Sequence, residues 1–381
     1  MKFTQSIFAA AFAFAAAAAF AAPVTTQGVG VGKHGDIQVA VTFDNGKIQK
    51  IDILKNAENP VLAKKVFTDL KDQIVAANSV QLDGISGATF TSKGLFAAVE
   101  DAAKKAGVTL GQADKKALKA AVKDLPKDAS YDVVVIGAGG AGFSAAIEAK
   151  NAGATVVLLE KMPQVGGNSL ISGAEMNAAK NWVQPKLGIT DDSPELHAKD
   201  TYLGGDKKGD MKVINVMTHN ALAGAEWCRD YLGVRFEPDN LFFFGGHSRK
   251  RALIPVGHTG TEFITKFQAK ADELGIPVIT NMKAEELIKD KSGRVVGVKA
   301  TMNGAEYTFN AKGGVVLATG GFGANPAMVK KYNPKIDERF KTTDAPGTTG
   351  EALYMAQRAG AELVNMQYIQ TYPICDPISG V

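Results

Sequence analysis

The chain has 381 residues, of which 45% are hydrophobic and 22% are charged, a composition typical of a soluble globular protein with two or three domains. Its net charge of +4 is spread along the sequence without runs of Lys and Arg between aromatic residues, which argues against nucleic-acid binding. The cysteines, Cys228 and Cys375, belong to no CxxC or CxxCH motif, so c-type haem attachment and cysteine-rich metal sites are excluded. We expect two separate buried thiols, with a single disulfide as the alternative.

The N-terminal residues 1–22 have the features of a secretory signal peptide. Lys2 gives a short basic start, residues 7–22 form an Ala/Phe run, and Ala22-Pro23 offers a small residue for cleavage. A membrane anchor is the alternative, but the run is short and alanine is only weakly apolar. We therefore expect a cleaved Sec-type signal and a periplasmic location in a bacterium.

Residues 23–110 predict a small α+β domain. Asp36 to Phe43 alternates like a strand, and Asp44-Asn45-Gly46 is a tight hairpin signal before a return strand over 47–54. Asn59-Pro60 opens a predicted helix of roughly fifteen residues. A second helix follows a glycine-rich loop and carries apolar residues on one face: Leu95, Phe96, Val99 and Ala103.

A second, larger domain is predicted after a Lys/Ala-rich linker over residues 111–130. It spans residues 131–365 and begins with an all-apolar strand, Val133 to Ile136, which suits a parallel strand buried on both faces. Helices and short β runs then alternate, which predicts an α/β fold. The expected β runs are Thr155 to Leu159, Val278-Ile279, Val295 to Lys299, Tyr307 to Asn310 and Val315 to Ala318.

The sequence Gly137-Ala138-Gly139-Gly140-Ala141-Gly142 matches the GxGxxG motif of a dinucleotide-binding fold. Gly137 permits the tight turn, Gly139 lets the backbone approach a pyrophosphate, and Gly142 lets the helix pack on the strand. The helix N-terminus supplies N–H donors for the phosphates. Glu160, at the end of the next predicted strand, is placed to bind ribose hydroxyls and disfavours NADP.

The dinucleotide is identified as FAD by resemblance. The stretch from Glu160 through Gly166-Gly167-Asn168-Ser169 resembles the second motif of FAD-binding oxidoreductases of the glutathione-reductase type, and Ala318-Thr319-Gly320-Gly321 resembles their later strand-end motif. The resemblance implies a Rossmann FAD domain with non-covalent FAD. It also implies contacts between FAD and Ala141, Glu160, Asn168, Ser169, Gly173, Ala284, Asp344 and Gly350.

A second flavin is expected in the N-terminal domain. Residues 83–89, Asp-Gly-Ile-Ser-Gly-Ala-Thr, resemble the flavinylation motif of FMN-binding domains, which carry FMN through a phosphoester to a threonine. That resemblance puts covalent FMN on Thr89, attached by a dedicated flavin transferase. The alternative is an ordinary helix cap formed by Thr91 or Ser92.

The order of signal peptide, FMN-binding domain and FAD domain resembles the periplasmic fumarate reductase family, which includes flavocytochrome c fumarate reductase and the urocanate reductases. The resemblance implies reduction of a C=C bond conjugated to a carboxylate, with electrons passing from FMN to FAD and then to the substrate. Fumarate-type members end the stretch over residues 365–373 with His-Pro, whereas Tyr372-Pro373 stands here. Tyr372 is therefore expected to bind substrate and to favour a urocanate-like enoate.

The C-terminal residues 366–381 are expected to begin a substrate-cap domain. The family's proton-donating arginine should lie beyond Val381, so the chain is expected to be an inactive fragment with no catalytic residue to assign. Arg249, Arg251, His247 and His258 are expected to have structural or FAD-phosphate roles. No metal is expected, and the remaining partner is an unidentified membrane or periplasmic electron donor. The alternatives are a fumarate reductase, a bi-flavin electron carrier without substrate chemistry, and an FAD oxidase or dehydrogenase working toward desaturation.

Overall fold

A computed structural model describes residues 22–371 except 83, 86–87, 112–124 and 338. The predicted signal peptide, Tyr372 and Cys375 lie outside the described residues, as does most of the predicted linker. By their contacts the residues divide into two compact units. The first contains residues up to Glu58 and 66–122, and the second contains 59–65 and the chain from Lys123 onward.

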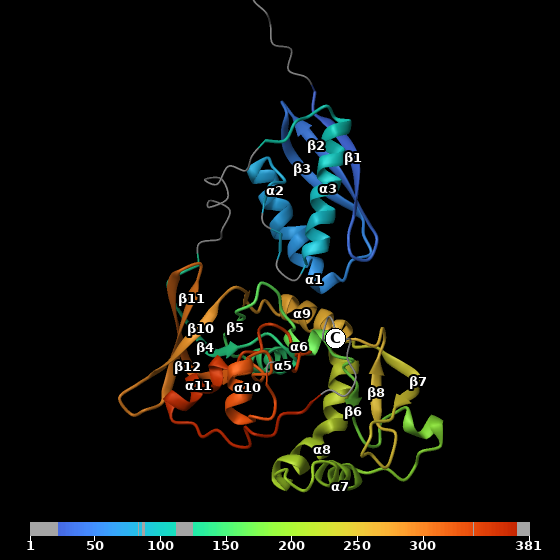
Figure 1. Cartoon of the computed structure of the whole chain (residues 1–381), viewed down its shortest axis with the longest axis vertical. Coiled ribbons are helices and arrows are strands. Elements are labelled where there is room, and N and C mark those ends of the chain that lie inside the picture. Colours follow the sequence, from blue (N-terminus) through green and yellow to red (C-terminus); the bar gives the residue numbers. More distant parts are fainter. Residues whose placement is uncertain (1–21, 83, 86–87, 112–124, 338, 372–381) are drawn as a thin grey trace, which may run out of the picture. The chain divides into compact units, whose positions relative to one another are not determined.

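The first unit is built on a three-stranded antiparallel sheet of β1 (Val24–Val31), β2 (Asp36–Asp44) and β3 (Lys47–Lys55), as Figure 1 shows. The predicted hairpin between β2 and β3 is confirmed, and both turn residues take positive φ angles, 49° at Asn45 and 73° at Gly46. The first strand, β1, was not predicted, because its buried positions are Gly28 and Gly30, so its sequence shows no alternation of apolar and polar residues.

The helix α3 (Thr89–Lys105) covers this sheet and contacts β1 most extensively. A Cβ atom at Gly28 would lie 1.9 Å from the Ala98 carbonyl oxygen, and one at Gly30 would lie 2.1 Å from that of Gly94. Only glycine therefore lets β1 approach the backbone of the helix so closely. The predicted apolar face is confirmed, since Leu95, Val99 and Ala103 are buried and Phe96 packs against the same core. The upstream helical segments are α1 (Pro60–Lys65), η1 (Val66–Leu70) and α2 (Lys71–Ala77).

The second unit contains a six-stranded sheet in the order β10-β11-β12-β4-β5-β9. The strands from β12 to β9 run parallel, and β10 and β11 add antiparallel pairs at one side. This arrangement confirms the predicted α/β fold of the FAD-domain type. The bounds are β4 (Asp128–Ile136), β5 (Val156–Leu159), β9 (Val278–Ile279), β10 (Lys283–Lys289), β11 (Val295–Met302) and β12 (Ala305–Leu317).

The two predicted β runs over residues 307–310 and 315–318 are one strand, β12, of 13 residues. An irregularity in its pairing with β4, between Ala311 and Gly314, interrupts the apolar pattern without ending the strand. Strand β4 begins at Asp128, within the stretch predicted as linker. Strand β10 was not predicted, since its Lys and Glu residues suit an exposed edge rather than a core.

Both faces of the large sheet are buried, as the apolar run of β4 predicts. Val135 and Leu158 join one core cluster with α5 (Gly140–Asn151) and α9 (Thr261–Glu273). Val134 and Val157 join a second cluster on the other face. The remaining helical bounds are α6 (Gly167–Ile171), η2 (Gln184–Leu187), α7 (Pro194–Gly204), α8 (Met211–Glu226), η3 (Trp227–Tyr231), α10 (Pro326–Tyr332) and α11 (Glu351–Ala359).

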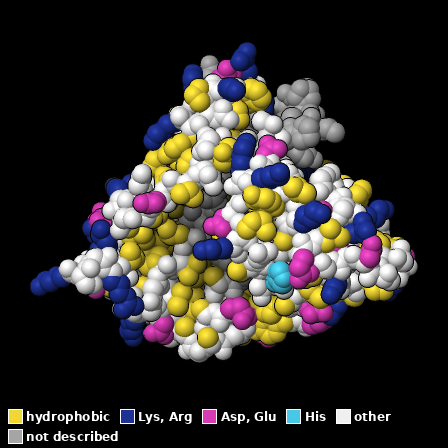
Figure 2. Space-filling model, turned by 90° about the horizontal axis from the view of Figure 1, so that it is seen from below, with side chains coloured by type: hydrophobic (Ala, Val, Ile, Leu, Met, Phe, Trp, Pro, Cys, Tyr) yellow, Lys and Arg dark blue, Asp and Glu magenta, His cyan; other side chains and the backbone are white. Residues whose placement is uncertain are grey.

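A smaller sheet, β6-β8-β7, lies beside α7 and α8 in this unit. Its strands are β6 (Met176–Asn177), β8 (Ala252–Pro255) and β7 (Phe236–Phe242). Nearby, Cys228 is a buried free thiol, and burial raises its pKa to about 11. On the face that Figure 2 shows, Lys and Arg side chains are scattered among acidic and hydrophobic ones. Among the described helices, none combines the length and apolar character that a membrane span requires.

Candidate functional site

The glycine-rich turn between β4 and α5 has the geometry that its motif predicts. Gly137 has a φ of +102°, and a Cβ atom there would lie 2.4 Å from the Ala318 carbonyl oxygen of the neighbouring chain segment. A Cβ atom at Gly142 would lie only 1.7 Å from the Gly137 carbonyl oxygen. At Gly139, by contrast, the nearest atoms would be 3.6 Å away, so the protein itself leaves room there. That room is what close approach of a pyrophosphate requires.

Helix α5 begins at this turn without a cap from the side chain of its N-cap residue. Its N-cap residue, Gly139, provides no side-chain acceptor, and Ala141 in the first turn is exposed. The N–H group of Gly140 donates to the Ser169 hydroxyl, at 3.1 Å. The helix start therefore presents N–H donors and a positive dipole end to an anion, which fits the phosphates of a dinucleotide.

Glu160 lies directly after β5 and next to the glycine-rich turn. One carboxylate oxygen accepts the Ala138 N–H at 2.9 Å, and the other accepts the Met162 N–H at 2.8 Å. Each oxygen keeps a further lone pair, and the residue is only partly buried. The carboxylate thus fixes the turn and can still accept hydrogen bonds from ribose hydroxyls. It is a better fit for a ribose than for a 2′-phosphate, which it would repel.

Asn168 joins the second predicted motif to a loop that is far away in sequence. Its Nδ2 donates to Asp344 Oδ1 at 2.5 Å, and its Oδ1 accepts the Ala345 N–H at 2.6 Å. Asp344 in turn needs a glycine opposite, because a Cβ atom at Gly323 would lie 1.8 Å from Asp344 Oδ2. The structure therefore brings Asn168, Ser169 and Asp344 to the same side of the glycine-rich turn.

Three other residues were predicted to contact FAD: Ala284, Gly173 and Gly350. Ala284, on β10, follows a segment tied to Glu160 by the Met282 N–H, which donates to the Glu160 carbonyl at 2.9 Å. Gly173 lies in the bend after α6, with the Glu175 carboxylate beside it. Gly350 is buried at the start of α11 with a φ of +77°, which makes it a turn residue. Their contacts with FAD remain predictions.

In the first unit, the start of α3 has the features expected of a flavin attachment point. Thr89 is its first residue and is exposed, and Phe90 beside it has 65% of its surface accessible. Ala88, the N-cap residue, makes no side-chain cap. The amides of the first turn are thus open to a phosphate, while the hydroxyl of Thr89 is accessible to a modifying enzyme. Residues 83 and 86–87 of the motif lie outside the described part.

Arg251, for which a structural or FAD-phosphate role was expected, is buried among acidic partners. Its guanidinium is fully buried and binds Asp192 with two hydrogen bonds, at 3.0 and 2.7 Å. It also donates to Asp200 at 2.7 Å and to His247 Nδ1 at 3.1 Å. His197 packs next to His247, with ring centroids 5.8 Å apart. We call these five residues the Arg251 cluster.

The ionisation of the Arg251 cluster follows from its burial. Burial acts to raise the pKa of Asp192, but hydrogen bonds from Arg251 and Gln184 outweigh it and hold that pKa below its usual value. For His197, burial and the Arg251 charge lower the pKa to about 4. Its Nδ1 is buried with no hydrogen-bond partner within the described part of the chain. The Arg251 charge is thus paired with Asp192 and Asp200, and His197 is neutral at pH 7, which fits a structural role for the cluster.

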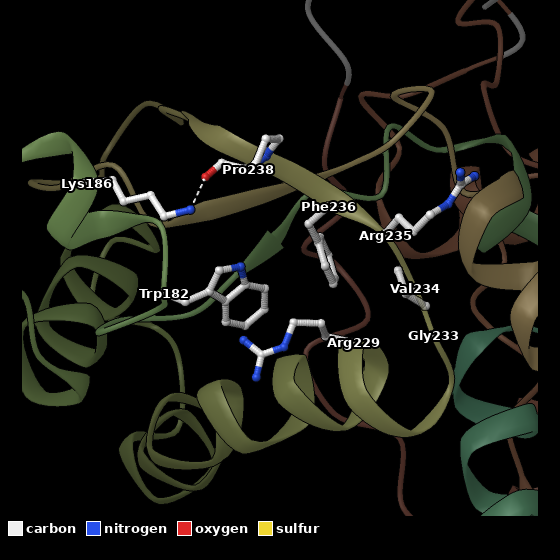
Figure 3. Close-up of a pocket in the computed structure, with 8 residues that line it drawn as sticks. All are labelled: Trp182, Lys186, Arg229, Gly233, Val234, Arg235, Phe236 and Pro238. Atoms are coloured by element: carbon white, nitrogen blue, oxygen red, sulfur yellow. Dashed lines mark hydrogen bonds between the residues drawn. The ribbon is translucent and has the colours of Figure 1, made fainter.

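A surface pocket of about 420 Å³ in the second unit lies between η2, η3 and β7, and Figure 3 shows its side chains. The Arg229 guanidinium stacks 4.0 Å above the Trp182 ring and binds Asp230. Lys186 donates to the Pro238 carbonyl oxygen at 2.8 Å. None of its lining residues was predicted to bind flavin: Trp182, Lys186, Arg229, Gly233, Val234, Arg235, Phe236 and Pro238. Because these cations already have partners, we assign the pocket no part in the flavin site.

Several residues that shape the two candidate sites could not be identified from the sequence. Gly323 accommodates Asp344, and Thr348 donates to Asn168 Oδ1 at 3.4 Å. In the first unit, the buried Glu58 accepts a hydrogen bond from the Thr91 hydroxyl. None of these belongs to a short local motif, so only the fold reveals them. Within the described residues, no group of three or more His, Cys, Asp or Glu suits a metal ion.

Comparisons with known proteins agree with this geometry. The family described as FAD binding domain matches residues 132–378, and the family described as FMN-binding domain matches residues 32–104. A urocanate reductase of Eggerthella lenta is 43% identical over 358 residues, which cover 93% of this chain and 58% of that protein. An NADH:acrylate oxidoreductase of Vibrio harveyi is 32% identical over 416 residues, covering 92% of this chain and 41% of that protein.

Among solved structures, the open conformation of a flavocytochrome c3 fumarate reductase superposes with a TM-score of 0.59 at 32% identity. The match covers 66% of this chain and 44% of that one. The chain thus spans 58% of the length of the first of these curated relatives and 41% of the second. It belongs to the flavoprotein family that includes urocanate and fumarate reductases, and it joins an FMN-binding domain to an FAD-binding domain.

Proposed function

We propose that the protein containing this chain is a periplasmic, flavin-dependent reductase of a C=C bond conjugated to a carboxylate. Electrons pass from FMN, held covalently on Thr89, to FAD and then to the substrate, for which a urocanate-like enoate is favoured. The observation that carries the proposal is the pairing of two flavin-compatible helix starts, at α3 and α5, in one chain. The names of the relatives, which include urocanate, acrylate and fumarate reductases, support the reaction class.

When bound, FAD would supply hydride at its N5 atom. The chain's own residues bind and orient it. The open amides of α5 hold the phosphates, Glu160 accepts the ribose hydroxyls, and Ser169 fixes the first turn of α5 through Gly140. The bond from Asn168 to Asp344 closes the neighbouring loop over the same side. The bonds of Ser169 to Gly140 and of Asn168 to Asp344 are already made within the protein, so they need no reorganisation when the flavin binds.

The substrate preference rests on Tyr372, whose placement lies outside the described residues. A phenol can hydrogen-bond a carboxylate, and its ring can pack on an aromatic substrate for about 0.5–1.5 kcal/mol. Fumarate needs a donor-rich or positive partner at each of its two carboxylates. Replacing the His of fumarate-type members by Tyr removes a potential cation, which would disfavour fumarate by about 1.5–3 kcal/mol.

The test uses the full-length protein with reduced viologen as electron donor. We expect kcat/KM for urocanate or cinnamate to exceed that for fumarate by roughly ten- to a hundredfold. The variant Tyr372→His should shift the preference toward fumarate. A wild type that prefers fumarate, or a variant without any shift, would contradict the assignment of Tyr372. Reduction of none of these enoates would contradict the reductase itself.

Flavin attachment has a separate test. The chain co-expressed with a flavin transferase should carry the mass of one phosphoester-linked FMN, and Thr89→Ala should carry none. The matched control is Thr25→Ala, at an exposed threonine on β1 of the same unit, which should be modified like the wild type. Full FMN mass in the Thr89→Ala protein would contradict the site.

A further inference from the structure

The start of α3 is held by side chains that do not themselves carry flavin. Thr91 and Ser92 follow Thr89 in the first turn, and both are buried, with 4% and 0% of their surfaces exposed. The Ser92 hydroxyl accepts the Ile85 N–H at 3.0 Å and donates to the Ala88 carbonyl at 2.9 Å. The first turn of α3 therefore turns two hydroxyl groups inward and leaves Thr89 facing outward.

The inward hydroxyl of Thr91 donates to Glu58, which lies just after β3. The Glu58 side chain is only 1% exposed, and its other oxygen accepts the His34 N–H at 2.8 Å. The carboxylate is closely enclosed, since a Cβ atom at Gly32 would lie 2.5 Å from Glu58 Oε1. A buried carboxylate is costly unless hydrogen bonds satisfy it, and such charge-assisted bonds are short and directional. Glu58 thus fixes the position of Thr91 rather than merely filling space.

We propose that Glu58 is a positioning residue for flavin attachment, acting through the Thr91 hydroxyl to orient Thr89; this rests on the proposed attachment of FMN to Thr89. A capping side chain at Ala88 would order the helix start but would also occupy the amides that a phosphate needs. Anchoring from the inner side of the helix orders the same turn and keeps those amides open. Thr89 and Thr91 lie in the same first turn of α3, so a bond that fixes Thr91 also fixes the backbone from which the Thr89 side chain projects.

The chemistry of attachment makes such positioning matter. The Thr89 oxygen attacks the FMN-side phosphorus of a flavin dinucleotide donor, the pyrophosphate P–O bond breaks, and the adenosine monophosphate leaves. The hydroxyl proton passes to a base of the transferase or to water, and no electrons are transferred. A misplacement of about 1 Å in such a reaction can lower its rate on the order of a hundredfold.

The test compares purified chains as acceptors for the flavin transferase, with FAD as donor. Thr91→Val removes the hydroxyl but keeps the side-chain shape, and Thr91→Ser keeps the hydroxyl. We expect Thr91→Val to lower kcat of attachment by about tenfold or more, with the KM for the acceptor chain unchanged, and Thr91→Ser to stay near the wild type. Glu58→Ala should resemble Thr91→Val.

The matched control is Thr26→Val. The Thr26 hydroxyl donates to the Ala102 carbonyl at 2.7 Å, on the same helix but near its other end. The Thr26→Val variant should lower the melting temperature by about as much as Thr91→Val does and leave kcat of attachment unchanged. An unaltered kcat in Thr91→Val, or an equal loss in Thr26→Val, would overturn the positioning role. If instead the wild type takes up no FMN, or Thr89→Ala still does, the attachment site itself is wrong.

Discussion

Helices α5 and α3 both begin without a capping side chain, at Gly139 and Ala88, yet they are held in different ways. The start of α5 depends on backbone contacts, since Gly137 and Gly142 allow chain segments to touch directly. The start of α3 depends on buried side chains, with Glu58 holding Thr91 from 33 residues upstream. A backbone-held site is specified by glycines in one short motif, whereas a side-chain-held site is specified by residues that only the fold brings together.

The largest expected effect concerns the backbone-held turn. Gly142→Ala puts a Cβ atom against the Gly137 carbonyl oxygen, so it should lower the free energy of unfolding of the second unit by about 3 kcal/mol. Gly139→Ala meets only ordinary contacts, so its melting temperature should hardly change, while its affinity for FAD should fall by about tenfold or more. Thermal unfolding of the full-length variants measures the change in stability, and FAD titration measures the change in affinity. If Gly139→Ala binds FAD normally, the turn does not hold the pyrophosphate.

A second prediction concerns the pH dependence of stability, because structure that is held by side chains contains groups that titrate, such as His197. The folded-state pKa of His197 is about 4, below its ordinary value of 6.5, so the unfolded chain binds a proton first as pH falls. Stability is therefore fully present above pH 6.5 and decreases between pH 6.5 and 4, by about 2–3 kcal/mol for this group.

Urea unfolding of the chain between pH 7 and pH 4 measures this slope. His197→Gln removes the titrating group and should flatten the curve over that range. The variant Gly139→Ala should keep the wild-type slope, because it leaves His197 and the partners of His197 unchanged. An unchanged slope in His197→Gln would show that the cluster does not couple protonation to folding.

The smallest expected effect concerns Glu160, a side chain that supports the backbone-held turn. Glu160→Gln keeps an acceptor oxygen for the Ala138 N–H but weakens the bonds available to a ribose, so FAD affinity should fall by about 1.5 kcal/mol, roughly tenfold. Glu148→Gln, on the exposed side of the same strand–helix unit, is the control. FAD titration distinguishes them, and equal affinities would remove Glu160 from the site.

The elements that could be predicted from sequence are those with local signals. The Asn45-Gly46 hairpin, the buried strand of β4 and the glycine-rich turn each carry their information within a few residues. Strand β1 could not be found in this way, because its glycines are explained only by the backbone of α3 lying against them. Glu58 gave no signal either, since a lone Glu before a helix is ordinarily a solvated residue.

Several distant partnerships in the candidate FAD site were equally hidden. Asn168 and Asp344 were both predicted to contact FAD, but nothing in the sequence indicates that they bind each other across 176 positions. The buried ionic contacts of Arg251 were also hidden, because Asp192 and Asp200 precede it in segments whose packing is not periodic. Sequence patterns report which face of an element is apolar, and they do not report which polar groups meet in three dimensions.

The position of β4 in the large sheet has a consequence for how the chain folds. Its partners are β5, which follows within 20 residues of its end, and β12, in which Leu317 pairs with Ile136. During synthesis, one edge of β4 thus stays unpaired until β12, which is made much later, has emerged from the ribosome. Long-range parallel pairing is slow, and an unpaired apolar edge promotes aggregation. The nascent chain is therefore expected to be prone to aggregation until β12 has been made.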